Sequence, residues 1–178
     1  MTALRSARID TPVGPLTLFV REGVLCALGF AESGDDRRRG LAARLRPLEA
    51  GIEDERPPGS VSGRLAAYFA GDLAALDAIP VDPGGTPFQQ SVWTELRRVG
   101  AGQTVAYSEL AARIGAPSAV RAVAAANARN PVAVVIPCHR VIGADGSLTG
   151  YGGGLERKRW LLEHEGARLP AQRGLSFR

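Results

Sequence analysis

Cys138 and His139 are the neighbouring residues of this chain best suited to chemistry. A cysteine thiol becomes a nucleophile when it loses its proton, and a nearby imidazole or guanidinium can favour the thiolate. Arg140 follows directly and supplies such a guanidinium. A lone cysteine beside an apolar run is more often a small buried hydrophobic residue, so the nucleophile interpretation depends on the surrounding sequence.

The segments on either side of Cys138 give that context. Residues 132–136 form a continuous apolar run, which predicts a buried strand that ends at the cysteine. A glycine-rich loop around Tyr151 follows, and such a loop is typical either of a ligand wall built from backbone amides or of an ordinary surface loop. A helix is predicted over residues 155–165.

Two familiar kinds of cysteine site do not fit this pattern. The chain has only two histidines, His139 and His164, which leaves little for a cysteine protease or a metal site to use. A phosphatase loop of the Cys-x5-Arg type is excluded because position 144 is alanine.

Residues 108–128 predict a helix-turn-helix. Ser108 can cap the first helix, residues 115–117 form a tight turn, and Ser118 can cap the second helix. On a helical wheel the outward side of the second helix is alanine edged with arginine: Arg121, Ala122, Ala125, Ala128 and Arg129. Alanine is the best helix former, which explains this face without any function. The alternative is close contact with a sugar-phosphate surface, even in a minor groove about 6 Å wide.

Proline and glycine divide the chain into two predicted domains. They cluster over residues 81–87, so we place an N-terminal domain at residues 1–83, a second domain at 84–166 and a tail at 167–178. The predicted elements are strands at residues 4–10, 16–21 and 24–30, helices at 35–48 and 61–70, and a helix that starts from a capping box at Thr86 and Gln89 and ends at Gly100. The predicted fold class is α+β.

Composition agrees with a folded protein that binds an anion. Of 178 residues, 45% are hydrophobic and 22% charged, and the net charge is +4, which favours nucleic acid as a partner. No apolar stretch approaches the roughly 18 residues of a membrane span, and the N-terminus lacks a secretory pattern. Two distant cysteines, Cys26 and Cys138, do not suggest a disulfide framework, so we expect a cytoplasmic protein without membrane contact.

Residues 86–166 resemble the 6-O-alkylguanine-DNA alkyltransferases, also called methylated-DNA–protein-cysteine methyltransferases. The resemblance rests on Pro-Cys-His-Arg-Val at 137–141, with Arg-Ala-Val at 121–123 and Asn-Pro at 130–131 before it, and Tyr-Gly-Gly at 151–153 and Leu-Leu-Glu-His-Glu-Gly at 161–166 after it. It implies a small ribonuclease-H-like α+β domain followed by a winged helix-turn-helix-like alkyltransferase domain. The N-terminal half is similar to the family more loosely.

The resemblance implies DNA repair by an irreversible transfer that each chain performs once. The alkyl group would move from the 6-oxygen of a flipped guanine, and also from the 4-oxygen of thymine, to Cys138 without a cofactor. His139 would act through a water molecule as the base toward Cys138, and Glu165 would orient His139. Tyr107 would bind the base and help to rotate its phosphate, and Arg121 would enter the stack in its place.

The resemblance also assigns the remaining contacts. Asn130 would brace the turn before the cysteine, and carbonyls of Cys138 and Val141 would accept from the guanine amino group. The Gly152 amide would donate to the 6-oxygen, and Tyr151 would wall the pocket. The residues expected at the DNA are Arg121, Ser108, Ala125 and Arg129. The implied partner is double-stranded DNA carrying alkylated guanine, bound by a monomer without an obligate protein partner.

Two departures from the family and two competing functions accompany this hypothesis. Some members bind zinc in the N-terminal domain, but this half has Cys26 and no histidine, so no metal is expected. Gly152 stands where some relatives carry serine, which leaves only the backbone donor. A catalytically silent DNA lesion-binding or regulatory helix-turn-helix protein is the main alternative, although silent relatives replace the cysteine. An unrelated cysteine hydrolase would turn over repeatedly.

Overall fold

The computed structural model describes residues 4–30 and 60–170, and the structural statements below refer to these ranges. The predicted helix at residues 35–48 lies outside them. Within the described ranges, no helix has the length and apolar character that crossing a membrane requires.

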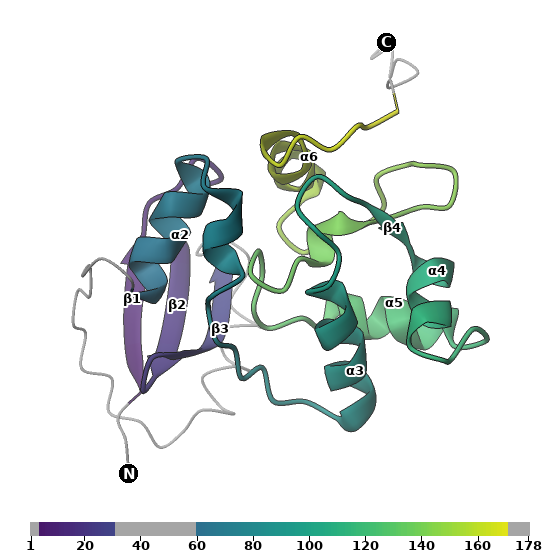
Figure 1. The fold of residues 1–178 in the computed structure, drawn as a ribbon, viewed down its shortest axis with the longest axis horizontal. Coiled ribbons are helices and arrows are strands. Elements are labelled where there is room, and N and C mark those ends of the chain that lie inside the picture. The colour runs from purple at the N-terminus through teal and green to yellow at the C-terminus, as the bar shows by residue number, and fades with distance from the viewer. Residues whose placement is uncertain (1–3, 31–59, 171–178) are drawn as a thin grey trace.

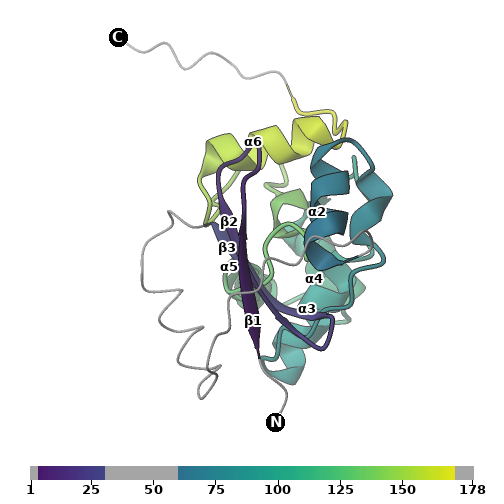
Figure 2. The same cartoon turned by 90° about the vertical axis from the view of Figure 1, so that its left-hand side faces the viewer.

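The N-terminal region is an antiparallel meander with a helix against it (Figures 1 and 2). Strands β1 (Arg5–Ile9), β2 (Leu16–Arg21) and β3 (Val24–Phe30) pair in that order, as predicted. Residues along β2 alternate between buried and half-buried, the period-2 pattern of a strand with one face in the core. Helix α2 (Val61–Phe69) follows, and the Ser60 side chain caps it by accepting from the Gly63 amide.

Helices dominate the C-terminal region (Figure 1). They are α3 (Pro87–Leu96), α4 (Tyr107–Arg113), α5 (Val120–Ala128) and α6 (Leu155–His164). The short strands β4 (Val105–Ala106) and β5 (Val141–Ile142) pair in parallel. The predicted capping box at Thr86 and Gln89 is present, whereas α3 ends at Leu96, before Gly100. Helices α3, α4 and α5 pack on one another, which confirms the predicted α+β class and helical second half.

The edge of β3 joins the two regions. Leu28 forms an isolated parallel bridge with Val132, in which the Leu28 amide donates to the Pro131 carbonyl over 2.9 Å and the Ala133 amide donates back over 2.9 Å. The strand that ends the N-terminal sheet therefore holds the chain a few residues before Cys138.

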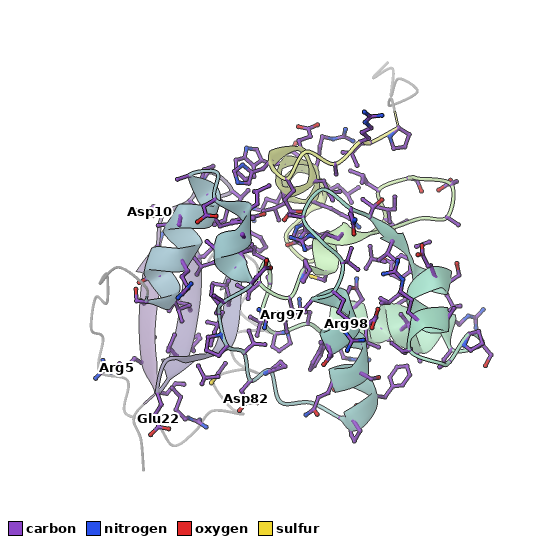
Figure 3. The ribbon with its side chains drawn as sticks, viewed as in Figure 1. Arg5, Asp10, Glu22, Asp82, Arg97 and Arg98 are labelled. Carbon is purple, nitrogen blue, oxygen red and sulfur yellow. The ribbon has the colours of Figure 1, made fainter. Side chains whose placement is uncertain are left out.

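Arg97 makes a second connection. It follows α3, and its Nη2 donates to the carbonyls of Leu76, Asp77 and Ile79 at 3.2, 3.4 and 3.0 Å. These carbonyls belong to or follow the 3-10 helix η1 (Leu73–Leu76). Figure 3 shows Arg97 where the N-terminal and C-terminal parts meet.

The prediction of a strand over residues 132–136 is wrong. Beyond the bridge at Val132 the chain turns: Val134 has a φ of 71°, and the Val135 amide donates to the Ala133 carbonyl over 2.8 Å. A β-branched residue at positive φ cannot continue a strand. Burial explains the apolar run, because a buried turn and a buried strand need the same side chains.

Both serine caps predicted in the helix-turn-helix are also wrong. Helix α4 starts at Tyr107, directly after Ala106 of β4, so Ser108 lies inside its first turn. Helix α5 starts at Val120 with Ala119 at the cap position and no side-chain cap. The predicted extents of α5 and α6 otherwise agree with the structure to within two residues.

Candidate active site

Cys138 begins a short 3-10 helix, η2 (Cys138–Arg140), not the end of a strand. Its amide donates to the Ile136 carbonyl over 2.8 Å, and the Arg140 amide donates to the Pro137 carbonyl over 3.0 Å. Cys138 is a free cysteine with 7% of its surface exposed. The site therefore presents one thiol, almost enclosed, on a tight backbone turn.

Asn130 fixes the turn that leads to Cys138. Its Nδ2 donates to the Ile136 carbonyl over 2.7 Å, and its Oδ1 accepts from the Val132 amide over 2.9 Å. A single side chain thus replaces the hydrogen bonds that a neighbouring strand would supply. This arrangement keeps residues 130–136 folded on themselves.

His139 and Glu165 form a buried pair beside the cysteine. His139 Nε2 and Glu165 Oε1 are 2.9 Å apart, and both side chains are fully buried. The other ring nitrogen, Nδ1, is also buried and has no hydrogen-bond partner among the described residues. With Nε2 protonated and donating to the carboxylate, Nδ1 carries the lone pair that a base needs.

Arg140 completes the environment of Glu165. Its Nε donates to Oε2 and its Nη2 donates to Oε1, each over 2.9 Å, while Nη1 donates to the Val99 carbonyl. Burial alone would raise the pKa of Glu165, but the hydrogen bonds from His139 and Arg140 outweigh it and hold that pKa well below its ordinary value. Burial lowers the pKa of His139, against the opposing pull of Glu165. The imidazole is therefore neutral and the carboxylate charged near pH 7.

Lys158 is a fully buried cation beneath the same site. Its Nζ donates to the Val141 carbonyl over 2.6 Å and to the Thr149 carbonyl over 2.9 Å. Burial lowers its pKa to about 8, although the nearby Cys138 acts in the opposite direction. This ammonium ties α6 to β5 and to the loop that follows β5.

The predicted pocket residues lie on that loop and on α4. The Tyr107 hydroxyl and the Thr149 Oγ1 are 3.1 Å apart. The Tyr151 hydroxyl is buried without a hydrogen-bond partner among the described residues, and burial raises its pKa well above the ordinary value. Its ring packs edge-on against Phe30 of β3, with centroids 6.0 Å apart, while Gly152 beside it is exposed.

The predicted DNA-contacting residues lie on α4, on α5 and directly after α5. Arg121 on α5, Arg129 after it and Ser108 on α4 are exposed, and Ala125 is half-buried. The opposite side of α5 is buried at Val123, Ala126 and Asn127, and Trp93 Nε1 donates to the Ala126 carbonyl over 2.9 Å. The predicted outward face of the second helix is thus open, with an arginine near each end.

Two residues of the site were missed by reasoning from the sequence. The hydroxyl of Tyr68 on α2 donates to Glu165 Oε1 over 2.7 Å, but no local signal in the sequence connects Tyr68 with the site. Lys158 had a usable signal, since it falls on the apolar stripe of α6 with Leu161 and Leu162, where a lysine needs a reason to be buried. Among the described residues no cluster of three or more His, Cys, Asp or Glu side chains could hold a metal ion.

Known protein families match both regions of the chain. The model of the 6-O-methylguanine DNA methyltransferase DNA binding domain matches residues 87–167, and that of the ribonuclease-like domain of the same methyltransferase matches residues 4–83. A methylated-DNA–protein-cysteine methyltransferase of Salmonella typhimurium is 46% identical over 167 residues, which cover 93% of this chain and 98% of the relative. One from Mycobacterium tuberculosis is 47% identical over 171 residues, covering 92% and 93%.

A solved structure extends the likeness to three dimensions. The crystal structure of Mycobacterium tuberculosis OGT in complex with DNA has a TM-score of 0.75 and 44% sequence identity to this chain, covering 94% of it and 96% of the other chain. Sequence, domain order and fold therefore agree. The chain belongs to the 6-O-methylguanine DNA methyltransferase family, and it is a DNA-binding repair methyltransferase of the kind that transfers methyl groups to a protein cysteine.

Proposed function

We propose that this protein repairs DNA by moving one alkyl group irreversibly from the 6-oxygen of guanine to Cys138, once per chain, with the 4-oxygen of thymine as a second source. The observation that carries the proposal is the arrangement around His139. Its Nε2 lies 2.9 Å from Glu165 Oε1, its buried Nδ1 has no hydrogen-bond partner among the described residues, and Cys138 directly precedes it in sequence. The geometry suits a base that acts on the thiol through one water molecule.

The reaction balances without a cofactor. His139 takes the Cys138 proton through water, the sulfur forms a bond to the alkyl carbon, and the bond between that carbon and the guanine oxygen breaks. The electron pair of the broken bond stays on guanine, which takes up the proton held by His139 and remains in the strand as the unmodified base. The thioether product resists hydrolysis because its carbon–sulfur bond has no good leaving group, so the thiol is not regenerated and the protein is consumed.

The loop after β5 supplies the recognition of the base. The carbonyls of Cys138 and Val141 accept from the guanine amino group, the Gly152 amide donates to the 6-oxygen, and Tyr151 walls the pocket. Lys158 supports this function because its bond to the Val141 carbonyl fixes the direction of that acceptor. Tyr107 binds the base, and its contact with Thr149 supports that position.

The exposed face of α5 handles the duplex. Arg121 fills the gap left by the extruded base, while Ser108, Ala125 and Arg129 contact the backbone of double-stranded DNA. Exposure of both arginines and the small size of the residues between them support a close approach to a groove. We also infer that the protein works as a monomer in the cytoplasm, where its two free cysteines, Cys26 and Cys138, stay reduced.

A stoichiometric assay tests the transfer. Incubation with duplex DNA containing 6-O-methylguanine, followed by peptide mass mapping, should find one methyl group per chain on Cys138. Cys138→Ala should abolish transfer and keep DNA binding, and Cys26→Ala should change neither. Methyl groups on Cys26, or product in excess of protein as a hydrolase would give, contradict the proposal. DNA binding without any transfer favours the silent lesion-binding alternative.

The same assay separates base extrusion from chemistry. Extruding a base costs a few kcal/mol, and Arg121 offsets part of that cost by filling the stack. Arg121→Ala should slow transfer strongly on duplex DNA, less on a mismatched or single-stranded substrate, and hardly at all on free 6-O-methylguanine. Arg121→Lys should restore only part of the duplex rate, since an ammonium does not stack. An equal proportional loss on every substrate would place Arg121 in the fold or the pocket instead.

A further inference from the structure

The carboxylate of the His139–Glu165 pair has a donor from the N-terminal region. The Tyr68 hydroxyl, on α2, donates to Glu165 Oε1 over 2.7 Å, and Tyr68 is fully buried. Oε1 therefore accepts from three side chains, Tyr68, His139 and Arg140, while Oε2 accepts from Arg140. The atom that orients the imidazole also holds a phenol that lies 97 residues away in sequence.

Tyr68 is held by contacts that do not involve its hydroxyl. His164 Nε2 and the Tyr68 carbonyl are 2.8 Å apart, and the Tyr68 ring packs edge-on against His164 and Phe69 with centroids 5.1 and 5.0 Å apart. The Trp160 ring in turn stacks on the His164 ring, with centroids 4.7 Å apart. The ring is thus fixed by packing, and its hydroxyl is directed at Glu165 by that packing.

We propose that Tyr68 is a positioning residue of the transfer reaction, which sets how strongly Glu165 attracts the His139 imidazole and thereby how readily His139 accepts the Cys138 proton. The inference rests on the proposed role of His139 as the base. It assigns to the N-terminal region a direct part in the chemistry, in addition to holding the chain before Cys138.

The direction of the effect follows from charge sharing. A carboxylate oxygen that accepts three hydrogen bonds offers less of its negative charge to each. Removing the phenol leaves more negative charge for His139, which stabilises the imidazolium and raises the pKa of His139. Because the base must be neutral to accept a proton, the acidic limb of the rate–pH profile then moves to higher pH.

The other charged and titratable groups around His139 stay in place when the phenol is removed. Arg140 on η2 and Lys158 on α6 both lower the pKa of His139, and Glu165 raises it. Cys138 precedes His139 on η2. Tyr151 interacts electrostatically with Cys138, Tyr68 and Glu165 but stays neutral, since its pKa is raised. The hydroxyl of Tyr68 is therefore the one partner that Tyr68→Phe deletes.

The test compares Tyr68→Phe with Trp160→Phe, which disturbs the same aromatic cluster without touching Glu165. Two rates are measured against pH in the full chain: methyl transfer from 6-O-methylguanine DNA and alkylation of Cys138 by iodoacetamide. We expect Tyr68→Phe to raise the midpoint of the acidic limb by about 0.5–1 pH unit and to keep the limiting rate within about threefold. Trp160→Phe should leave the midpoint unchanged. Imidazole nitrogen shifts in NMR, simple to assign with two histidines, should show the same rise for His139.

A second variant keeps the inference falsifiable if Tyr68→Phe does not fold. Site-specific 3-fluorotyrosine at position 68 preserves the shape and donates more strongly, so the midpoint should move to lower pH. A midpoint that stays unmoved or rises with 3-fluorotyrosine overturns the inference by itself. Where both variants fold, midpoints that move in the same direction also overturn it, because a purely structural role predicts that result. Midpoint shifts with iodoacetamide but no methyl transfer in any form would overturn the proposed function and leave the Tyr68 assignment standing.

Discussion

The sheet β1–β3 and the segment 130–140 satisfy their buried backbone groups in opposite ways. In the sheet, each strand supplies the hydrogen bonds of its neighbour, with Arg5 opposite Val20 and Leu16 opposite Phe30. In residues 130–140, side chains do much of this work: Asn130 holds the Ile136 carbonyl, and Arg140 reaches the Val99 carbonyl. Among the described residues, Arg140 of this segment is a buried charge, and the buried Lys158 and Glu165 of the α6 region bond to Val141 and Arg140.

This difference predicts where the molecule tolerates substitution. A ladder between strands survives the loss of a side chain, because its donors and acceptors are backbone groups. A backbone carbonyl held by one side chain loses its partner when that side chain is shortened, and an unpaired buried group costs about 1–3 kcal/mol. The region that performs the chemistry is therefore also the one most easily damaged by single changes.

Arg140→Met should give the largest effect. It leaves the Glu165 carboxylate buried without its guanidinium and the Val99 carbonyl without its donor, and losing one partner of a buried ion pair costs about 3–5 kcal/mol. Arg8→Met on exposed β1 is the control in the sheet and should stay within about 0.5 kcal/mol. Denaturant unfolding measures both, and equal losses would remove the contrast between the two regions.

Asn130→Ala should have the next largest effect. Two hydrogen bonds of the turn disappear and leave the Ile136 carbonyl and the Val132 amide unpaired, so the free energy of unfolding should fall by about 2–3 kcal/mol and methyl transfer should slow. Ser6→Ala, which removes a small polar side chain from the edge strand β1, should cost less than about 0.5 kcal/mol. If Asn130→Ala left the transfer rate and stability intact, residues 130–136 would hold their turn without that side chain.

The smallest expected changes in stability concern two serines that each precede a helix. Ser60 caps α2 through the Gly63 amide, so Ser60→Ala should cost about 1 kcal/mol. Ser118 precedes α5 without capping it, so Ser118→Ala should change stability by less than about 0.5 kcal/mol. Thermal unfolding of the two variants measures both changes. If Ser118→Ala lost more stability than Ser60→Ala, α5 would depend on a contact of Ser118.

Local patterns predicted the regular elements, because the cause of each lies within a few residues. A short apolar run between turn residues identified β2, and the capping box placed the start of α3 at Pro87. The strand predicted over residues 132–136 was wrong for a physical reason. The turn found there depends on the Asn130 side chain and on the positive φ of Val134, and neither can be recognised from an apolar composition.

In the candidate site, too, some contacts could be predicted from the sequence and others could not. The family resemblance linked His139 with Glu165, and in the structure His139 Nε2 and Glu165 Oε1 lie 2.9 Å apart. Tyr68 could not be linked to them, since its partner depends on how α2 and α6 pack. Lys158 interrupts the apolar stripe of α6, so the sequence marks it as an unusual lysine but does not indicate which groups it bonds to.

The bond between Tyr68 and Glu165 also has a consequence for the order of folding. It closes 97 residues of chain, and contacts of such high sequence separation form late because loop closure costs entropy before the contact rewards it. The helices and the β-meander can form from local contacts while His139 still lacks its oriented carboxylate. In a refolding experiment, the ability to accept a methyl group from DNA should appear with the slowest phase, after the helical signal has recovered, so competence for repair marks completion of the whole chain.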